Sequence, residues 1–160
     1  LLRSGAREGD AVYVSGTLGD AAGALAMLRG EWLPAPEHAE YLLQRLNRPR
    51  ARLQLGSELL ASATAAIDIS DGLMADAGHI AAASGVRIVI DPERLPRSAA
   101  LRSHGSADQV TAWALTGGDD YELCFCLPSG VTAPAAGTCV GRVTAGAGVD
   151  CGLPIAGPGG

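Results

Sequence analysis

The sequence has few aromatic side chains and lacks any long apolar run. Its 160 residues include one Phe, two Trp and three Tyr, so a hydrophobic core has to be built mainly from Leu, Ala, Val and Ile. No apolar run approaches the roughly 18 residues that span a bilayer, and a basic start followed by an apolar signal core is also lacking. We therefore expect a cytoplasmic protein without a membrane partner.

An excess of basic charge and paired cysteines are lacking as well. The net charge of −5 argues against a nucleic-acid partner and favours acidic clusters that bind cations. Of the four cysteines, Cys124 and Cys126 alternate along a strand pattern, whereas Cys139 and Cys151 stand alone. Neighbouring cysteines on one strand face rarely have disulfide geometry, and no C-x-x-C metal spacing occurs. We therefore predict buried free thiols.

The sequence does have the composition of a folded α/β domain. It is 48% hydrophobic and 18% charged, which is typical of a globular protein of one compact domain. Strand patterns cover residues 11–15, 66–69, 86–91, 121–127 and 138–143, and helical patterns cover residues 20–28, 37–46, 51–62, 73–83, 98–104 and 109–115. This interleaving predicts an α/β (α+β) domain over residues 11–150, with a mixed sheet of about five strands and helices against it. Residues 151–160 read as a Gly/Pro-rich tail.

A first acidic turn follows the strand at residues 66–69. Asp68, Ser70 and Asp71 fall within four positions, and Gly72 leads into a helical pattern. On a strand, Asp68 and Ser70 point to the same side, and Asp71 belongs to the opening turn of the helix. Two carboxylates and a hydroxyl beside a helix N-terminus can hold Mg²⁺ and a phosphate that shares it. Alternatively, Ser70 or Asp71 merely caps the helix.

A second acidic turn, Gly117-Gly118-Asp119-Asp120, precedes the strand at residues 121–127. Adjacent carboxylates repel each other unless solvent or a cation relieves the charge, and the glycines allow close approach of a ligand. The alternative is an exposed turn whose acids face water. His79 follows Asp71 by eight residues, roughly two helical turns. No Ser/His/Asp or Cys/His set can be assembled, so we predict no nucleophilic catalysis and assign no catalytic residue.

Two further sequence features, a Gly-rich turn and a cluster of arginines, can each be interpreted as a ligand site or as structural. The turn at residues 16–20 is Gly-rich and could cradle a phosphate, but it fits neither the P-loop nor G-x-G-x-x-G, which favours a structural turn. Four arginines, Arg45, Arg48, Arg50 and Arg52, lie within eight positions. They could meet phosphate or an acidic partner, or form a solvated helix end, and we assign them no role.

Six motifs in order resemble the thiamine-monophosphate kinases. They are Arg3-Ser4-Gly5-Ala6-x-x-Gly9-Asp10, the Val14–Gly23 stretch, Ala66-Ile67-Asp68-Ile69-Ser70-Asp71-Gly72-Leu73, Asp76-x-Gly78-His79-Ile80, Gly117-Gly118-Asp119-Asp120-Tyr121-Glu122-Leu123, and Val140-Gly141-Arg142-Val143-Thr144. Together they cover the chain up to about Gly148. The resemblance places the chain in the aminoimidazole-ribotide synthetase superfamily. It matches the C-terminal domain of these proteins, and residues 1–10 correspond to the connection from their N-terminal domain. The 160 residues do not include that N-terminal domain.

The resemblance implies a kinase that transfers the γ-phosphoryl group of ATP directly to thiamine phosphate with the help of Mg²⁺. It implies Mg²⁺ binding by Asp68 and Asp71, ATP or nucleotide contacts by Ser70 and Arg3, and a contact of Asp119 with thiamine phosphate. It also implies homodimers of the full-length protein. The N-terminal domain with its own aspartates and the aromatic ending of the family are missing here. We therefore expect little or no kinase activity from this chain alone.

Two other interpretations remain at this point. The chain could belong to another ATP-dependent enzyme of the superfamily, such as a synthetase or a selenophosphate-forming relative. It could also be a non-catalytic fragment that binds nucleotide weakly or serves as a folded partner. The pairing of the two acidic turns favours the kinase.

Overall fold

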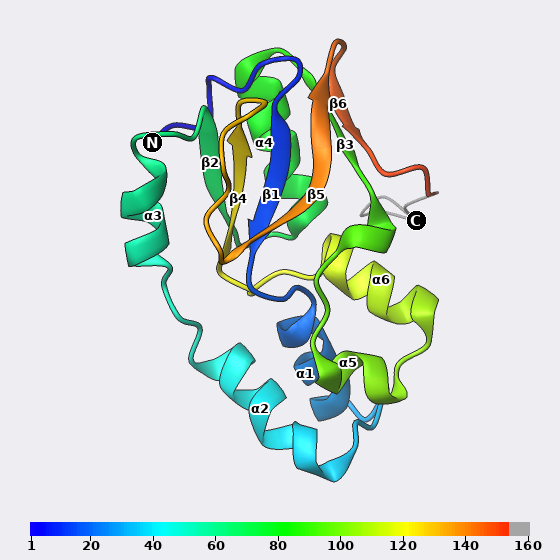
Figure 1. Ribbon diagram of the computed structural model, residues 1–160. Helices are drawn as coiled ribbons and strands as arrows, with labels where there is room; N and C mark the ends of the chain where they lie inside the picture. The colour runs from blue at the N-terminus through cyan, green and yellow to red at the C-terminus, as the bar shows by residue number, and fades with distance from the viewer. Residues whose placement is uncertain (154–160) are drawn as a thin grey trace.

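A computed structural model describes residues 1–153, apart from the side chain of His104. Figure 1 shows one sheet with the strand order β2-β4-β1-β5-β3-β6. The strands are β1 (Ala11–Ser15), β2 (Ala65–Ile69), β3 (Arg87–Ile90), β4 (Glu122–Leu127), β5 (Gly137–Thr144) and β6 (Gly148–Asp150). Neighbouring strands pair antiparallel except β3 and β6, which pair parallel.

Six α-helices and one short 3₁₀ turn connect the strands within the described part of the chain. They are α1 (Asp20–Leu28), α2 (Pro36–Asn47), α3 (Leu53–Leu59), α4 (Leu73–Ser84), α5 (Ala99–His104), α6 (Ala107–Thr116) and the turn η1 (Pro92–Arg94). Helix α4 lies against the sheet, whereas α1, α2, α5 and α6 gather beyond one end of it (Figure 1). In the part of the chain that the structure describes, no helix combines the length and the apolar character required to cross a membrane.

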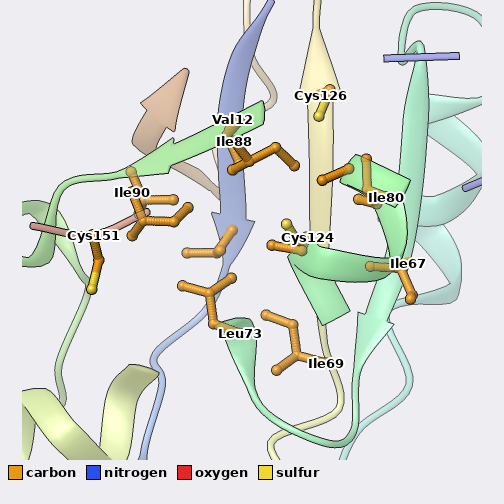
Figure 2. Packing of buried hydrophobic residues seen from close by; sticks show 14 of the residues in the cluster. Val12, Ile67, Ile69, Leu73, Ile80, Ile88, Ile90, Cys124, Cys126 and Cys151 are labelled. Atoms are coloured by element: carbon orange, nitrogen blue, oxygen red, sulfur yellow. The ribbon is translucent and has the colours of Figure 1, made fainter. Parts of the chain in front are cut away.

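The main core lies between α4 and one face of the sheet (Figure 2). Ile67, Ile69 and Cys124 from adjacent strands pack there with Leu73 and Ile80 of the helix. The side chains of β4 alternate, so Cys124 and Cys126 face this core while the intervening residue faces the other side. Aliphatic burial therefore replaces the aromatic packing that the composition cannot supply.

The opposite face of β4 carries a smaller core. Phe125 and Leu127 pack with Leu55 and Leu59 of α3, and the Phe125 ring stacks on Tyr13 with ring centroids 5.6 Å apart. The strand is thus covered on both faces, which explains its nearly continuous apolar sequence.

The helices beyond the end of the sheet have a core of their own. Leu42 of α2 and Leu101 of α5 are fully buried there with small residues of α1. Trp32 and Trp113 meet edge to face, with ring centroids 5.2 Å apart. This third core packs α1 and α2 against α5 and α6, next to the strand ends where a group of buried polar residues lies.

The predicted α/β architecture is confirmed, with six strands in place of about five. The additional strand is β6, three residues within a Gly-rich segment that gave no strand pattern. Helix α3 is shorter than the predicted 51–62 segment. All four cysteines are free, as predicted, although Cys139 is only partly buried. Burial raises the pKa of Cys126 to about 12, which suits an inert packing role. Residues 154–160 of the predicted tail lie outside the described residues.

Candidate functional site

The two acidic turns lie side by side because their strands are neighbours. β2 and β4 pair antiparallel with Ile69 opposite Glu122, so the end of β2 meets the beginning of β4. The backbone N–H of Asp119 donates to the carbonyl of Ser70 at 2.9 Å, and the N–H of Tyr121 donates to the carbonyl of Ile69 at 2.9 Å. Two segments about 50 positions apart in the sequence therefore form one loop cluster at one end of the sheet.

Glycine is required where these turns touch. A Cβ atom on Gly118 would lie 2.6 Å from the Ser70 carbonyl oxygen, and one on Gly72 would lie 2.8 Å from the backbone of Thr116. The chain is also bent into the left-handed region at Asp119 (φ 65°) and Tyr121 (φ 50°). Backbone conformations of this kind cost free energy for residues other than glycine and concentrate at functional sites.

The first turn is held by Asp76, not by a side-chain cap. Helix α4 begins after Gly72 and has no side-chain cap hydrogen bond, so neither Ser70 nor Asp71 has the capping role considered above. The buried carboxylate of Asp76 accepts the backbone N–H groups of Ser70 and Asp71 at 2.9 and 3.0 Å. Asp68 and Asp71 remain exposed. The turn is fixed through its backbone, which leaves these two carboxylates available to a ligand.

One group of potential metal ligands forms around Asp71. Atoms of Asp71, Asp76 and His79 that could bind a metal lie within 4.8 Å of one another. The expected separation of roughly two helical turns between Asp71 and His79 is wrong, because Asp71 precedes the helix and does not belong to it. Carboxylate oxygens are the donors that Mg²⁺ prefers, so the oxygens at this turn fit that ion. Asp68 is not a member of this group.

Arg3 and Asp68 line one surface groove beside the edge strand β2. The carbonyl of Leu2 accepts the N–H of Ala66 at 2.9 Å, which places residues 1–4 along the outer edge of that strand. Both Arg3 and Asp68 are exposed. Asp119 is exposed as well, at the turn that touches Ser70. The structure therefore gathers Ser70, Asp71 and Asp119 at the joined turns and places Arg3 and Asp68 in the adjacent groove.

The two carboxylates of the second turn behave differently. Asp119 is exposed, whereas Asp120 is only 1% exposed. Asp120 accepts the N–H groups of Gly19 and Ala21 at 2.7 and 3.4 Å, at the start of α1. Burial raises the pKa of Asp120 to about 7, against the opposing effect of those hydrogen bonds. An acidic turn whose carboxylates both face water is therefore excluded, and sequence reasoning missed the structural role of Asp120.

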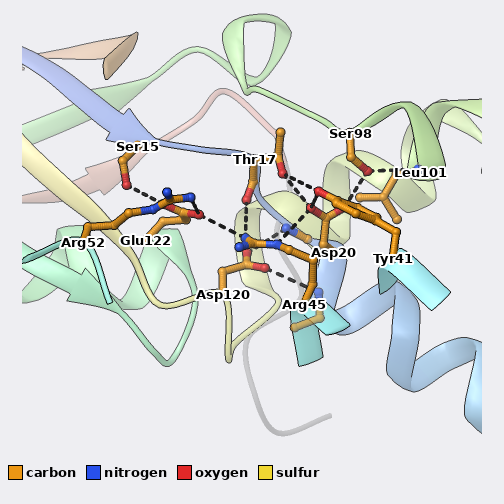
Figure 3. A network of polar contacts seen from close by, with 12 residues as sticks. Ser15, Thr17, Asp20, Tyr41, Arg45, Arg52, Ser98, Leu101, Asp120 and Glu122 are labelled. Atoms are coloured by element: carbon orange, nitrogen blue, oxygen red, sulfur yellow. Dashed lines mark hydrogen bonds and ion pairs between the residues drawn. The ribbon is translucent and has the colours of Figure 1, made fainter. Parts of the chain in front are cut away.

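A buried network of charged side chains, joined by ion pairs and hydrogen bonds, lies next to this turn (Figure 3). The carboxylate of Glu122, which is fully buried, accepts a bidentate pair of hydrogen bonds from Arg52 at 2.7 and 2.6 Å. It also accepts the Ser15 hydroxyl at 2.5 Å and forms an ion pair with Arg45 at 3.1 Å. Arg45 in turn lies 3.3 Å from Asp20. Two of the four clustered arginines are thus structural, which the sequence did not indicate.

A second buried carboxylate, Asp20, completes the network. Its oxygens accept the hydroxyl groups of Thr17 at 2.6 Å, Tyr41 at 2.9 Å and Ser98 at 2.5 Å. Asp20 begins α1 immediately after the Gly16–Gly19 turn, so that turn is engaged with protein groups here. This agrees with the structural interpretation favoured from its sequence.

Comparison with known proteins now identifies the family. Residues 7–131 match the sequence model of a protein family, the C-terminal domain of AIR synthase related proteins. The chain belongs to this family. It is also 45% identical over 155 residues to the thiamine-monophosphate kinase of Salmonella typhimurium, covering 91% of this chain and 48% of that protein.

Solved structures agree with this family membership. The crystal structure of thiamine-monophosphate kinase from Stenotrophomonas maltophilia matches with a TM-score of 0.88 and 43% identity, over 95% of this chain and 52% of that one. AaThiL in complex with AMPPCP and TMP matches with a TM-score of 0.86 and 40% identity, over 98% and 52% of the two chains. The resemblance recognised in the motifs is confirmed. The chain spans about half the length of the curated relatives it matches.

Proposed function

We propose that this chain is the C-terminal part of an ATP-dependent kinase that phosphorylates thiamine monophosphate to thiamine diphosphate. The relatives that bear the name thiamine-monophosphate kinase support this assignment at 43–45% identity. The complex of AaThiL with AMPPCP, an ATP analogue, and TMP supports the substrate pair. The kinase is preferred over another superfamily enzyme because these named relatives match nearly the whole chain.

The observation that carries the proposal is the backbone junction between the two acidic turns. It brings Ser70, Asp71 and Asp119 into one exposed loop cluster through the two hydrogen bonds of 2.9 Å. Phosphoryl transfer asks for positioned phosphates and neutralised charge rather than a protein nucleophile. An acid-rich cluster without a nucleophile is the side-chain chemistry that this reaction requires.

We assign Asp68 and Asp71 as ligands of Mg²⁺. Both carboxylates are exposed, and the carboxylate oxygens at the turn fit the donor preference of this ion. When bound, Mg²⁺ neutralises charge on the phosphate groups during transfer. Ser70 and Arg3 contact the nucleotide in this proposal, and Asp119 contacts thiamine phosphate. These residues bind and orient the two substrates.

The reaction we propose is a direct displacement. A phosphate oxygen of thiamine phosphate attacks the γ-phosphorus of ATP, a new P–O bond forms, and the bond from that phosphorus to the β–γ bridging oxygen breaks. ADP leaves, and no phospho-enzyme forms. In this proposal an N-terminal domain, which the relatives have and this sequence does not include, supplies the other substrate and metal contacts. Residues 1–10 connect that domain to the C-terminal domain over residues 11–150. A homodimer and a cytoplasmic location stay predictions.

The test uses calorimetric titration of ATP with Mg²⁺, and of thiamine phosphate, into the wild-type chain and the Asp68→Asn/Asp71→Asn variant. We expect the affinity for ATP·Mg²⁺ to fall by at least about tenfold in the variant, because two charged ligands are lost. Mn²⁺ serves as a paramagnetic substitute in parallel. It should broaden the NMR signals of Ser70 and Asp71 in the wild type only.

The matched control is Asp108→Asn/Asp150→Asn, which also removes two negative charges, but from exposed positions on α6 and β6. It should bind ATP·Mg²⁺ like the wild type. Equal binding by the wild type and the Asp68/Asp71 variant would show that the metal role assigned to these residues is wrong.

A further inference from the structure

A strongly basic pocket lies beside the buried ion network, at the end of α2. Its volume is about 700 Å³, and its walls include Thr17, Tyr41, Arg45, Arg48, Arg50 and Arg52. Arg45 belongs to α2, and the other three arginines follow in the segment that leads to α3. This concentration of positive charge contrasts with the net charge of −5 for the whole chain.

The charges around this pocket do not cancel. Arg45 and Arg52 are balanced by the buried carboxylates of Asp20 and Glu122. Arg48 and Arg50 are exposed, and within residues 1–153 neither forms an ion pair. Arg48 and Arg50 therefore give the pocket an excess of positive charge.

Some guanidinium N–H groups that face this region also lack a protein acceptor in the described part of the chain. The Nη2 atom of Arg45 donates to the Thr17 carbonyl and pairs with Glu122, whereas its buried Nε, 3.3 Å from Asp20, has no hydrogen-bond partner among the described residues. Arg52 donates through Nε and Nη2 to Glu122. Among the described residues, the Nη1 atom of neither arginine has a hydrogen-bond partner. Both guanidinium groups are held in place by buried carboxylates. Their free donors are therefore preorganised, which reduces the entropy lost when a ligand binds.

We propose that this pocket binds a small anion that carries a phosphate group and at least two negative charges. Guanidinium groups bind phosphate oxygens through paired, charge-assisted hydrogen bonds. Arg45 and Arg52 provide the fixed wall, and Arg48 and Arg50 neutralise the ligand at the rim. Thr17 and Tyr41 also line the pocket. Free pyrophosphate and the phosphate group of an organic ester share this chemistry.

The site is separate from the acidic turns and does not depend on the proposed kinase function. Arg52 also lines the groove that contains Asp68 and Tyr121, so the two sites are neighbours that share one wall. Among the described residues that line the pocket, none is an Asp or a Glu that could bind a metal, and its charged groups are all arginines. Binding should therefore persist in EDTA, whereas binding at the acidic turns requires a divalent cation.

The experiment titrates pyrophosphate, and separately inorganic phosphate and glycerol 3-phosphate, into the wild-type chain in EDTA. NMR should show shifts of the Thr17 and Arg48 amides, and affinity should fall as NaCl is raised. The Arg48→Ala/Arg50→Ala variant should weaken pyrophosphate binding by at least about tenfold. Both side chains are exposed, so the variant keeps the buried network. Tighter binding of the ester than of pyrophosphate would identify an organic phosphate as the ligand.

The matched control is Arg29→Ala/Arg102→Ala, which removes two exposed arginines elsewhere. It should bind pyrophosphate within about twofold of the wild type. The proposal is overturned if pyrophosphate does not bind at millimolar concentration, if the control loses as much affinity as the pocket variant, or if Arg48→Ala/Arg50→Ala binds normally. The Asp68→Asn/Asp71→Asn variant should bind pyrophosphate normally in EDTA, which separates failure here from failure of the proposed function.

Discussion

Glu122 carries the buried carboxylate that two arginines share. It is 0% exposed, and its carboxylate carries the bidentate contact of Arg52, the ion pair with Arg45 and the Ser15 hydroxyl. Removing one partner of a buried pair leaves the other charge without compensation. This single carboxylate therefore holds the end of β1, the start of β4 and the α2–α3 segment together.

We predict that Glu122→Gln lowers the free energy of unfolding by about 2–4 kcal/mol. Glutamine keeps the size but not the charge, so Arg45 and Arg52 lose their common counter-ion. The partial exposure of Arg52, whose side chain is 34% exposed, keeps the expected loss below that of a fully enclosed pair. Urea unfolding measures the change.

The control for this prediction is Glu40→Gln. Glu40 is exposed and accepts only the Gln44 amide one helical turn away, so its loss should cost less than about 0.5 kcal/mol. If Glu122→Gln unfolds at the same urea concentration as the wild type, the ion network contributes no net stability.

The sequence could indicate only part of this arrangement. Glu122 shares a strand face with Cys124 and Cys126, and that alternation is a signal for a buried side chain at this position. Its partners could not be predicted, because Arg52 and Ser15 are 70 and 107 positions away. Asp76 had a weak signal, since a carboxylate in the first turn of a helix is favoured near free N–H groups. That signal did not reveal that Asp76 fixes the Asp68–Asp71 turn.

At the scale of whole elements, the sequence predicts strands and helices correctly where apolar residues recur at a regular spacing along the segment. The strands at residues 11–15 and 121–127 and the helix at 73–83 follow apolar alternation or helical spacing, and the structure confirms them within one or two residues. β6 was missed because three residues between glycines have no periodicity. Its strand conformation comes from parallel pairing with β3, which is a tertiary contact.

Helix α1 and the second acidic turn are coupled through Asp120, and the coupling should depend on pH. Burial raises the pKa of Asp120 in the folded protein from 3.8 to about 7. Between these values the folded state keeps a proton that the unfolded state has lost, so the contribution of Asp120 to stability falls as pH rises from about 4 to 7. The loss reaches at most about 4 kcal/mol above pH 7.

Asp120→Asn tests this coupling, because an amide cannot ionise and its oxygen can still accept the Gly19 N–H. We expect the variant to gain stability relative to the wild type as pH rises through this window. Urea unfolding at pH 4.5, 6 and 8 for both proteins gives the difference, in which other titrating groups cancel. A difference that is independent of pH would contradict the raised pKa.

For the whole molecule, the ordered motifs predicted the family, and the comparisons confirm it. Motifs succeed here because six short patterns in a fixed order are far more specific than any one of them alone. The antiparallel pairing of β2 with β4 then brings the turns together.

The last prediction concerns the activity of this chain by itself. Asp68, Asp71 and Asp119, to which we assign the metal and substrate contacts, are exposed in this chain, and phosphoryl transfer depends on substrates that are enclosed and aligned. We expect turnover at least about a thousandfold slower than that of the full-length Salmonella typhimurium relative under the same conditions. The assay follows thiamine diphosphate formed from ATP, thiamine phosphate and Mg²⁺ at high enzyme concentration. Adding the N-terminal half of that relative should raise the rate if the two halves associate. Near-normal turnover by the chain alone would mean that the acidic turns suffice for catalysis, and that the other half serves a different purpose.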